Sequence, residues 1–196
     1  MSAEPQTRPA DLRRATLDAA ARLLAREGPG GLAVRRIAAE AGCSTMSVYH
    51  YFGDKQGLLD AVQSEGHDRL RAAQSVRRET GDPEADVRGT CLAYREMALA
   101  HPDYFRIMFA DTPPGLSRPH GEVRSIAREN YAAFVDVVRR WHERSPLRTD
   151  PASAAYGLWA TGHGMVVLEL TAHAPVADRA ERYATTIDAL MTGLRR

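Results

Sequence analysis

The residues of this 196-residue chain that are best suited to chemistry lie close together in the run CSTMSVYHYF, residues 43–52. The run combines a cysteine, a histidine and two tyrosines, whose side chains bind metal ions, react as nucleophiles or form hydrogen bonds. Three interpretations therefore have to be compared: a metal or redox site, part of a hydrophobic core, and a surface that binds a partner.

A metal or redox site is the weakest of the three interpretations. Zinc takes three or four protein ligands, and Cys43 and His50 have no further ligand residues near them in the sequence. The only other cysteine is Cys91, and two cysteines without framework spacing do not indicate a disulfide. We therefore expect no metal, no cofactor and no disulfide.

The elements around this run are predicted from apolar periodicity, which is helical along the whole chain. A first helix precedes the GPGG run at 28–31, and a second has apolar residues spaced i, i+3, i+4, i+7 from Val34. Gly42 stops the second helix, since glycine readily adopts positive φ. Ser44 and Asp54 are placed to cap the third and fourth helices. The sequence thus predicts an all-α protein that begins with short, capped helices.

Two short helices joined by a turn with a glycine are typical of a helix-turn-helix motif. On the second helix of this pair, Val48 and Phe52 lie four residues apart and are predicted to face the core. The same spacing puts Cys43 in the buried turn, which argues against a reactive thiol. The outward face would then carry Thr45, Met46, Tyr49 and His50. Such a face suits the major groove of DNA, where these groups reach base edges and phosphates.

Charge adds a weak indication of the same kind. The net charge is +1, but residues 1–55 hold eight Lys and Arg against six Asp and Glu. Lys55 is the only lysine in the chain and opens the fourth helix. Its ammonium group, its backbone N–H and the helix dipole could all meet one phosphate. Any basic surface is therefore expected in the N-terminal part of the chain, residues 1–55.

The run GLAVRRIAAEAGCSTMSVYHYFGDKQGLLDAV resembles the DNA-binding segment of the tetracycline-repressor (TetR) family, over about residues 11–60. The resemblance implies base reading by Thr45, Met46 and Ser47, and contacts to backbone or base by Arg35, Tyr49, His50, Tyr51 and Lys55. Two positions depart from the family pattern. Ala33 stands where a threonine is usual, and Tyr51 where a histidine is usual.

Residues 61–196 resemble the variable helical half of the same family. Asp82 and Pro83 are placed to start a helix that runs to about Ala100, and Pro102 restarts it. Three long helices are predicted at 121–143, 151–173 and 177–194. The runs AYREMALAHPDYFRIMF and LWATGHGMVVLEL resemble a subclass of regulatory domain named for a Trp-His-Gly run. The expected architecture is a three-helix helix-turn-helix DNA-binding domain (11–60) followed by a helical ligand-binding and dimerisation domain (61–196).

The two last helices carry surfaces suited to a second helix. Helix 151–173 has a stripe of small residues formed by Gly157, Ala160, Thr161, Gly164 and Leu168. The last helix has an apolar seam formed by Ala180, Tyr183, Ile187, Leu190 and Leu194. The family resemblance implies a symmetric four-helix interface between two copies. Core packing within a monomer is the alternative.

Aromatic and methionine side chains of this half are candidates for a ligand pocket between helices. The predicted lining is Tyr94, Met108, Phe109, Tyr131, Trp159, His163 and Met165. His163 is its best polar member, since glycines flank it on both sides. The alternative is that these side chains, like most at helical spacing, simply form the core.

The chain has no Gly-rich phosphate loop and no G-x-S-x-G elbow, so we expect no enzyme. No apolar run approaches the roughly 18 residues of a membrane span, and the start lacks a secretory apolar region, so we expect a cytoplasmic protein. The sequence predicts a homodimeric regulator of transcription on palindromic double-stranded operator DNA, a repressor released by an unknown small-molecule effector. A ligand-independent DNA-binding protein or an activator on the same scaffold is the alternative.

Overall fold

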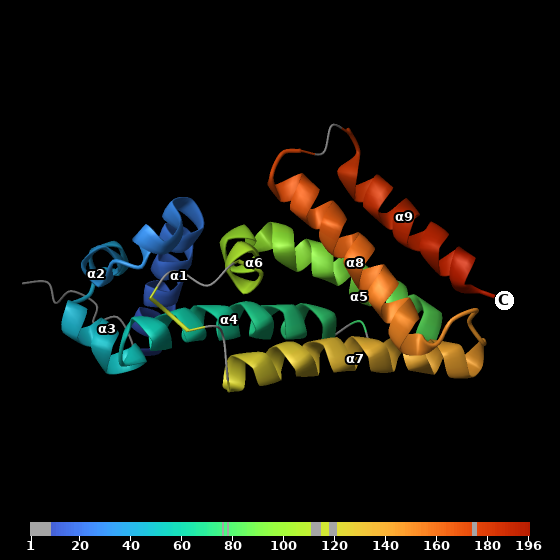
Figure 1. Ribbon diagram of the computed structural model, residues 1–196, viewed down its shortest axis with the longest axis horizontal. Coiled ribbons are helices and arrows are strands. Elements are labelled where there is room, and N and C mark those ends of the chain that lie inside the picture. Colours follow the sequence, from blue (N-terminus) through green and yellow to red (C-terminus); the bar gives the residue numbers. More distant parts are fainter. Residues whose placement is uncertain (1–8, 76, 78, 111–114, 118–120, 174–175) are drawn as a thin grey trace, which may run out of the picture. The chain divides into compact units, whose positions relative to one another are not determined.

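The computed structural model describes residues 9–75, 77, 79–110, 115–117, 121–173 and 176–196, and every regular element in these ranges is a helix (Figure 1). This confirms the predicted all-α class. The predicted helix break at Pro175, and most of the one in DTPPGLSRPHG, lie outside the described residues. The elements are α1 (Pro9–Glu27), the 3-10 turn η1 (Gly28–Gly31), α2 (Val34–Ala41), α3 (Thr45–Phe52), α4 (Lys55–Ser75), α5 (Pro83–Ala100), α6 (Pro102–Met108), α7 (Glu122–Arg144), α8 (Pro151–Leu170) and α9 (Arg179–Leu194).

The chain divides into two compact units. The first unit comprises Met1–Gly66 and Asp103–Arg124, and the second comprises His67–Pro102 and Ser125–Arg196. The sequence placed the boundary near residue 60 and assigned everything after it to one domain. The structure instead divides the chain inside α4, after Gly66, and gives most of α6 to the first unit.

Capping residues set the ends of the short helices in the first unit. Gly42 follows α2 with φ = 68°, in the left-handed region that favours glycine. The Ser44 hydroxyl accepts a hydrogen bond from the N–H of Ser47 at 3.0 Å. The Asp54 carboxylate accepts one from the N–H of Gly57 at 2.8 Å. All three caps were predicted from the sequence and are confirmed.

Helix α6 adds its apolar face to the core of the first unit. Tyr104 and Ile107 are buried in the same cluster as the apolar residues of α1–α4. The Tyr104 hydroxyl donates a hydrogen bond to Asp18 of α1 at 2.7 Å. Gly66 lets α6 approach α4 closely, because a Cβ there would lie 2.7 Å from Cγ and Sδ of Met108. Contacts between distant parts of the sequence thus complete this core.

The second unit packs α5, α7, α8 and α9 together with the end of α4, and Figure 1 shows α8 and α9 side by side. Asp82 caps α5 as predicted, since its carboxylate accepts hydrogen bonds from the N–H groups of Glu84 and Ala85. Arg95 of α5 and Glu169 of α8 form a two-bond ion pair at 2.9 and 2.7 Å, with both side chains largely buried. These contacts fix α5 against α8.

The buried face of α9 differs from the predicted seam. Tyr183 and Ile187 are buried within the unit, which agrees with the alternative of core packing at these two positions, whereas Ala180 is exposed and Leu190 and Leu194 are only half-buried. The third buried position is Met191, four residues after Ile187. The seam that packs within the unit is therefore Tyr183, Ile187 and Met191, and the half-buried leucines lie beside it.

Close packing at Gly162 of α8 generates a stability prediction. A Cβ at this position would lie 2.6 Å from the hydroxyl of Tyr183, which donates a buried hydrogen bond to the Cys91 carbonyl at 2.9 Å. Glycine to alanine inside a helix normally stabilises by about 0.5–1 kcal/mol. We expect Gly162→Ala instead to lower the free energy of urea unfolding by about 1–3 kcal/mol, because of overpacking.

The control for this prediction is the same substitution in a Tyr183→Phe background. Without the hydroxyl, the nearest remaining atom is the ring Cζ at 3.5 Å, an ordinary contact. There Gly162→Ala should be neutral or stabilising. Equal effects of Gly162→Ala in both backgrounds would show that the close contact with Tyr183 does not limit this position.

Candidate nucleic-acid interface and effector site

Helix α3 has one buried and one exposed face. Val48 is 2% exposed and Phe52 is 8% exposed, and both belong to the core of the first unit. On the other side, Met46 is 76% exposed and Tyr49 is 47% exposed. This division confirms the one predicted from helical spacing. A large apolar side chain as exposed as Met46 marks a surface that is suited to contact with a partner.

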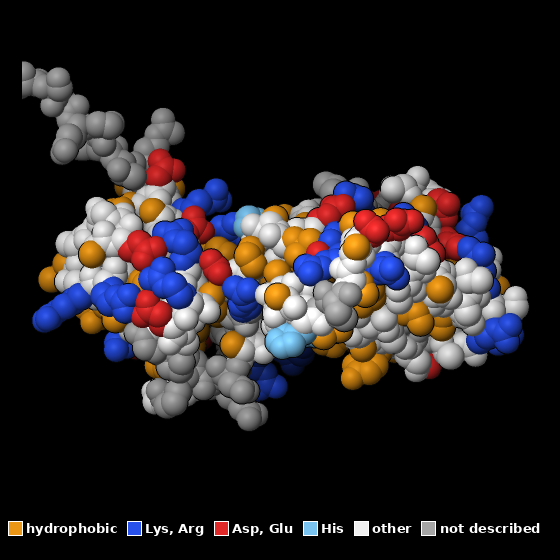
Figure 2. Space-filling view, turned by 90° about the horizontal axis from the view of Figure 1, so that it is seen from above, with side chains coloured by type: hydrophobic (Ala, Val, Ile, Leu, Met, Phe, Trp, Pro, Cys, Tyr) orange, Lys and Arg blue, Asp and Glu red, His pale blue; other side chains and the backbone are white. Residues whose placement is uncertain are grey.

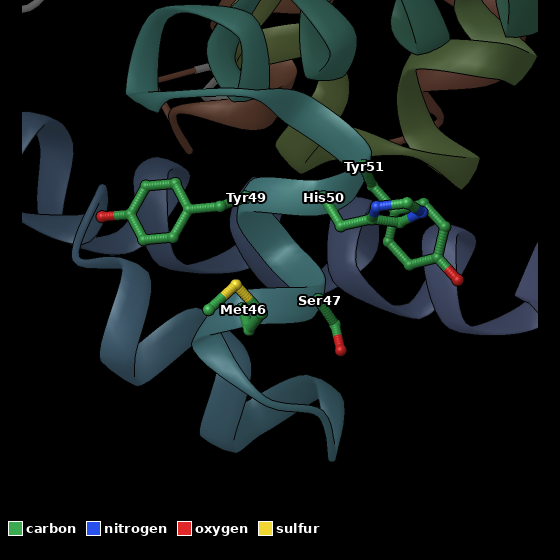
Figure 3. A pocket seen from close by; sticks show the side chains of 5 residues that line it. All are labelled: Met46, Ser47, Tyr49, His50 and Tyr51. Atoms are coloured by element: carbon green, nitrogen blue, oxygen red, sulfur yellow. The ribbon is translucent and has the colours of Figure 1, made fainter.

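The exposed side of α3 forms an open hollow of ≈ 470 Å³, lined by Met46, Ser47, Tyr49, His50 and Tyr51. Figure 3 shows Tyr49 on one side of the helix and the rings of His50 and Tyr51 on the other. Those two rings contact each other edge to face, with centroids 5.4 Å apart. The surface therefore offers hydroxyl, imidazole and thioether groups together, the kinds of group that contact phosphates and base edges.

The eight predicted DNA-binding residues differ in how accessible they are. Six of them are exposed: Arg35, Thr45, Met46, Tyr49, His50 and Lys55. Ser47 and Tyr51 are half-buried. The Ser47 hydroxyl lies 2.9 Å from that of Ser44, the cap of α3, so its hydrogen bonding is shared with the helix end. Thr45 and Met46 are thus the more accessible of the three predicted base-reading residues.

Two of these residues provide positive charge at helix starts. Arg35 lies in the first turn of α2 and Lys55 is the first residue of α4. Neither forms an ion pair with any residue that the structure describes. Free backbone N–H groups and the positive end of the helix dipole accompany a side chain at such a position. Each position can therefore bind an anion such as a backbone phosphate.

A cluster of aromatic side chains in the second unit contains four of the seven predicted effector-binding residues. Trp159 of α8 is its centre, with ring centroids at 5.6 Å from Tyr131 and 6.0 Å from His163. His163 Nδ1 lies 2.8 Å from the hydroxyl of Tyr94. Tyr156, which was not predicted, also belongs to the cluster: its ring is 6.1 Å from that of Trp159, three residues away on the same helix.

Burial sets the protonation of this cluster. It raises the pKa of Tyr94, and a hydrogen bond from Trp159 opposes that shift. The Tyr94 hydroxyl therefore keeps its proton, and it lies within hydrogen-bond distance of His163 Nδ1. Burial also lowers the pKa of His163. The cluster is therefore an uncharged site of rings and hydrogen-bonding groups at neutral pH.

The other three predicted effector-binding residues are not members of this cluster: one is on another side of α8 and two belong to the first unit. Met165 is half-buried on α8, two residues from His163, and so faces another side of the helix. Met108 packs against Gly66 in the first unit. Phe109, also in the first unit, is 39% exposed and its ring is 5.1 Å from that of Phe105. Within the second unit the structure thus brings together Tyr94, Tyr131, Trp159 and His163, and places Met165 on another side of α8.

The predicted stripe of small residues on α8 is mostly open. Gly157, Ala160, Gly164 and Leu168 are exposed, and Thr161 is half-buried. A Cβ at Gly157 or Gly164 would meet no atom within 4 Å. Tyr156 and Val167 are exposed beside the stripe, so this face of α8 is apolar and is left open by the residues that the structure describes.

The structure offers little else that could carry chemistry. No three His, Cys, Asp or Glu side chains in the described ranges are grouped as a metal site would require. Cys43 is half-buried, with Sγ 3.9 Å from the Thr16 hydroxyl, and burial raises the pKa of Cys91 to about 12. None of the helices described is both long and apolar enough for a membrane span.

Comparisons with known proteins match both parts of the chain. The family model described as "Bacterial regulatory proteins, tetR family" matches residues 17–62, and one described as "Tetracyclin repressor-like, C-terminal domain" matches residues 87–190. The chain is 30% identical to the HTH-type transcriptional repressor Rv1474c of Mycobacterium tuberculosis, over 94% of this chain and 93% of that protein.

Solved structures agree with these matches. A Rhodococcus protein of unknown function is 28% identical, with a TM-score of 0.79 over 94% of this chain and 96% of its own. The TetR family transcriptional regulator PfmR from Thermus thermophilus is 22% identical, with a TM-score of 0.75 over 92% of this chain and 99% of its own. The second likeness shows a shared fold.

The buried histidines generate a prediction about pH. Burial holds the pKa values of His163 and His67 below the ordinary 6.5, so the unfolded chain binds protons more readily than the folded one. Their contribution to stability is complete above about pH 7 and declines as the pH falls through 6.5. We expect the free energy of unfolding to decrease between about pH 7.5 and 5.5.

The variant His163→Gln should weaken this pH dependence, and replacement of the exposed His173 by Gln should leave it unchanged. Urea unfolding at both pH values gives the comparison. If wild type and His163→Gln lost the same stability on acidification, His163 would not be held neutral by the fold.

Proposed function

Because the chain belongs to the tetracycline-repressor family of bacterial regulatory proteins, we propose that it is a homodimeric repressor that leaves its operator when a small molecule binds its second unit. Membership of this family makes the chain a DNA-binding regulator of transcription. The relative from M. tuberculosis, which matches nearly the whole chain, is named a transcriptional repressor, and this supports repression as the direction of control.

The exposed face of α3 is the observation that carries the proposal. Thr45 and Met46 stand at its start, where a recognition helix contacts base edges. A threonine hydroxyl accepts or donates at a base edge, and a methionine presses on a thymine methyl group. Tyr49, His50 and Lys55 would contact phosphates, which fix the position of the helix without reading sequence.

The open face of α8 supports dimer formation. Small residues allow a second helix to approach closely, and Leu190 and Leu194 of α9, which are only half-buried, offer further apolar area. In a symmetric dimer the same patch meets itself. The two recognition helices would then enter major grooves about 34 Å apart on a near-palindromic operator.

The aromatic cluster around Trp159 supports an apolar or amphipathic effector. Its rings offer stacking surfaces, and the Tyr94–His163 pair offers hydrogen bonds to one polar group of the ligand. An effector shifts a dimer away from DNA only if it binds the two dimer shapes with different affinity. Such a ligand would favour a separation of recognition helices that no longer fits the operator.

The first prediction from this proposal concerns recognition of the operator's base sequence by α3. Met46→Ala and Thr45→Ala should each cost about 1–3 kcal/mol at particular operator positions, and leave other positions unaffected. Lys55→Ala should weaken binding to all sequences alike. Binding to a set of single-base operator variants, measured by fluorescence anisotropy, separates the two effects.

The result against this assignment would be an unchanged base preference in both the Thr45 and the Met46 variant. The protein would then read its operator with a different element. Ala39→Gly, on the exposed side of α2, is a matched control, since it also changes an exposed helix residue of the first unit.

The second prediction concerns the dimer. A Cβ at Gly164 would meet no atom within 4 Å, so Gly164→Leu adds bulk to the open face of α8 and the monomer should remain folded. We expect the variant to sediment as a monomer and to lose operator affinity by at least tenfold. Ala132→Leu, at an exposed position of α7, is the control. A normal dimer for Gly164→Leu would move the interface to another surface.

A further inference from the structure

Arginines of the first unit fall into two groups according to their partners. Arg22 pairs with Glu40 at 2.8 Å, while Arg26 and Arg36 both pair with Glu27, at 3.0 and 2.5 Å. Hydrogen bonds from Arg36 and then Arg26 lower the pKa of Glu27 to about 2, so the carboxylate is charged throughout the physiological range. Figure 2 shows basic and acidic side chains interleaved on one face of the molecule. These arginines are neutralised within the chain.

The second group has no such partners. Of the described residues before Gly66, the cations Arg13, Arg14, Arg35 and Lys55 form no ion pair with any described carboxylate. Arg35 and Lys55 were predicted to contact DNA. Arg13 was not, and its surroundings single it out from the rest.

Arg13 lies four residues before Leu17, a fully buried core residue, and therefore on the face of α1 that packs onto the core. It is nevertheless exposed, because it stands in the first turns of the helix. Its guanidinium carbon is 5.5 Å from the centre of the Phe52 ring. Arg13 thus lies on the side of α1 that faces the core, and its guanidinium group stacks on the ring of Phe52, the last residue of α3.

A row of ring contacts connects Arg13 to residues at the end of α3 that were predicted to contact DNA. Ring contacts run along the end of α3 from His50 to Tyr51, at 5.4 Å, and from Tyr51 to Phe52, at 6.1 Å. Arg13 lies at the far end of this row. Lys55 begins α4 three residues after Phe52. Two unpaired cations therefore border the carboxyl end of α3.

We propose that Arg13 binds a backbone phosphate beside the carboxyl end of α3, with Phe52 holding its guanidinium in place. The inference rests on the proposed function, since it assumes that α3 enters the major groove. Phosphate strands border the groove at both ends of a helix lying in it, and the carboxyl end of a helix carries partial negative charge. A cation is needed there to accept a phosphate.

Arginine suits this role for a specific reason. Its planar guanidinium stacks on an aromatic face and still presents N–H donors at its edge to a phosphate. Contact with the fixed ring of Phe52 also restricts the side chain before DNA arrives, which reduces the entropy lost on binding. A purely structural role, in which Arg13 only covers Phe52, would give stability without any effect on DNA.

The experiment measures binding of the full-length protein to a random-sequence duplex of about 30 base pairs, as a function of salt concentration. Arg13→Met keeps an unbranched chain over Phe52 and removes the charge. Arg22→Met, on the same helix, removes an equal charge that is already paired with Glu40. Arg13→Lys restores the charge without the planar group. Thermal unfolding of each variant reports on the structural role separately.

We expect Arg13→Met to reduce the slope of log affinity against log salt by about 1 per subunit, and the affinity near 0.1 M salt by about 5- to 10-fold per subunit. Arg22→Met should keep the wild-type slope, and Arg13→Lys should keep most of it. A slope for Arg13→Met equal to that of Arg22→Met would overturn the inference while leaving the proposed function intact. Absence of salt-dependent DNA binding by the wild-type protein would overturn both.

Discussion

The burial of Val48 and Phe52 is the constraint on which the candidate DNA-binding surface depends. Helix α3 has only eight residues, too few for a stable helix in isolation, so tertiary packing must hold it. Two anchors one turn apart fix its rotation about its own axis. Every outward position follows from that rotation, including those of Met46 and Tyr49. Loss of either anchor would therefore affect the orientation of the whole surface as well as stability.

Most of the first unit could be predicted from the sequence because its signals are local. Gly42, Ser44 and Asp54 act on backbone groups within three residues of themselves, and such caps follow from residue type and position. The two faces of α3 follow from helical periodicity alone. The resemblance to the tetracycline-repressor family, which rested on these same residues, was confirmed by comparisons that cover both halves of the chain.

Contacts between distant segments could not be predicted in this way. Periodicity shows that Tyr104 has an apolar neighbourhood, but not that its hydroxyl meets Asp18, 86 positions earlier in the chain. For the same reason the approach of Met108 to Gly66, 42 positions earlier in the chain, could not be foreseen. Arg13 shows a further limit. Its register with Leu17 was visible in the sequence, but the ring that it covers belongs to another helix.

In the proposed function, two copies of the chain present α3 to a symmetric DNA site. Selection of bound duplexes from a randomised pool, followed by sequencing, tests this most directly. The account predicts enrichment of an inverted repeat whose half-site centres lie one helical turn, about 10 base pairs, or a multiple of it apart. Enrichment of a single asymmetric site, or of no sequence at all, would contradict it.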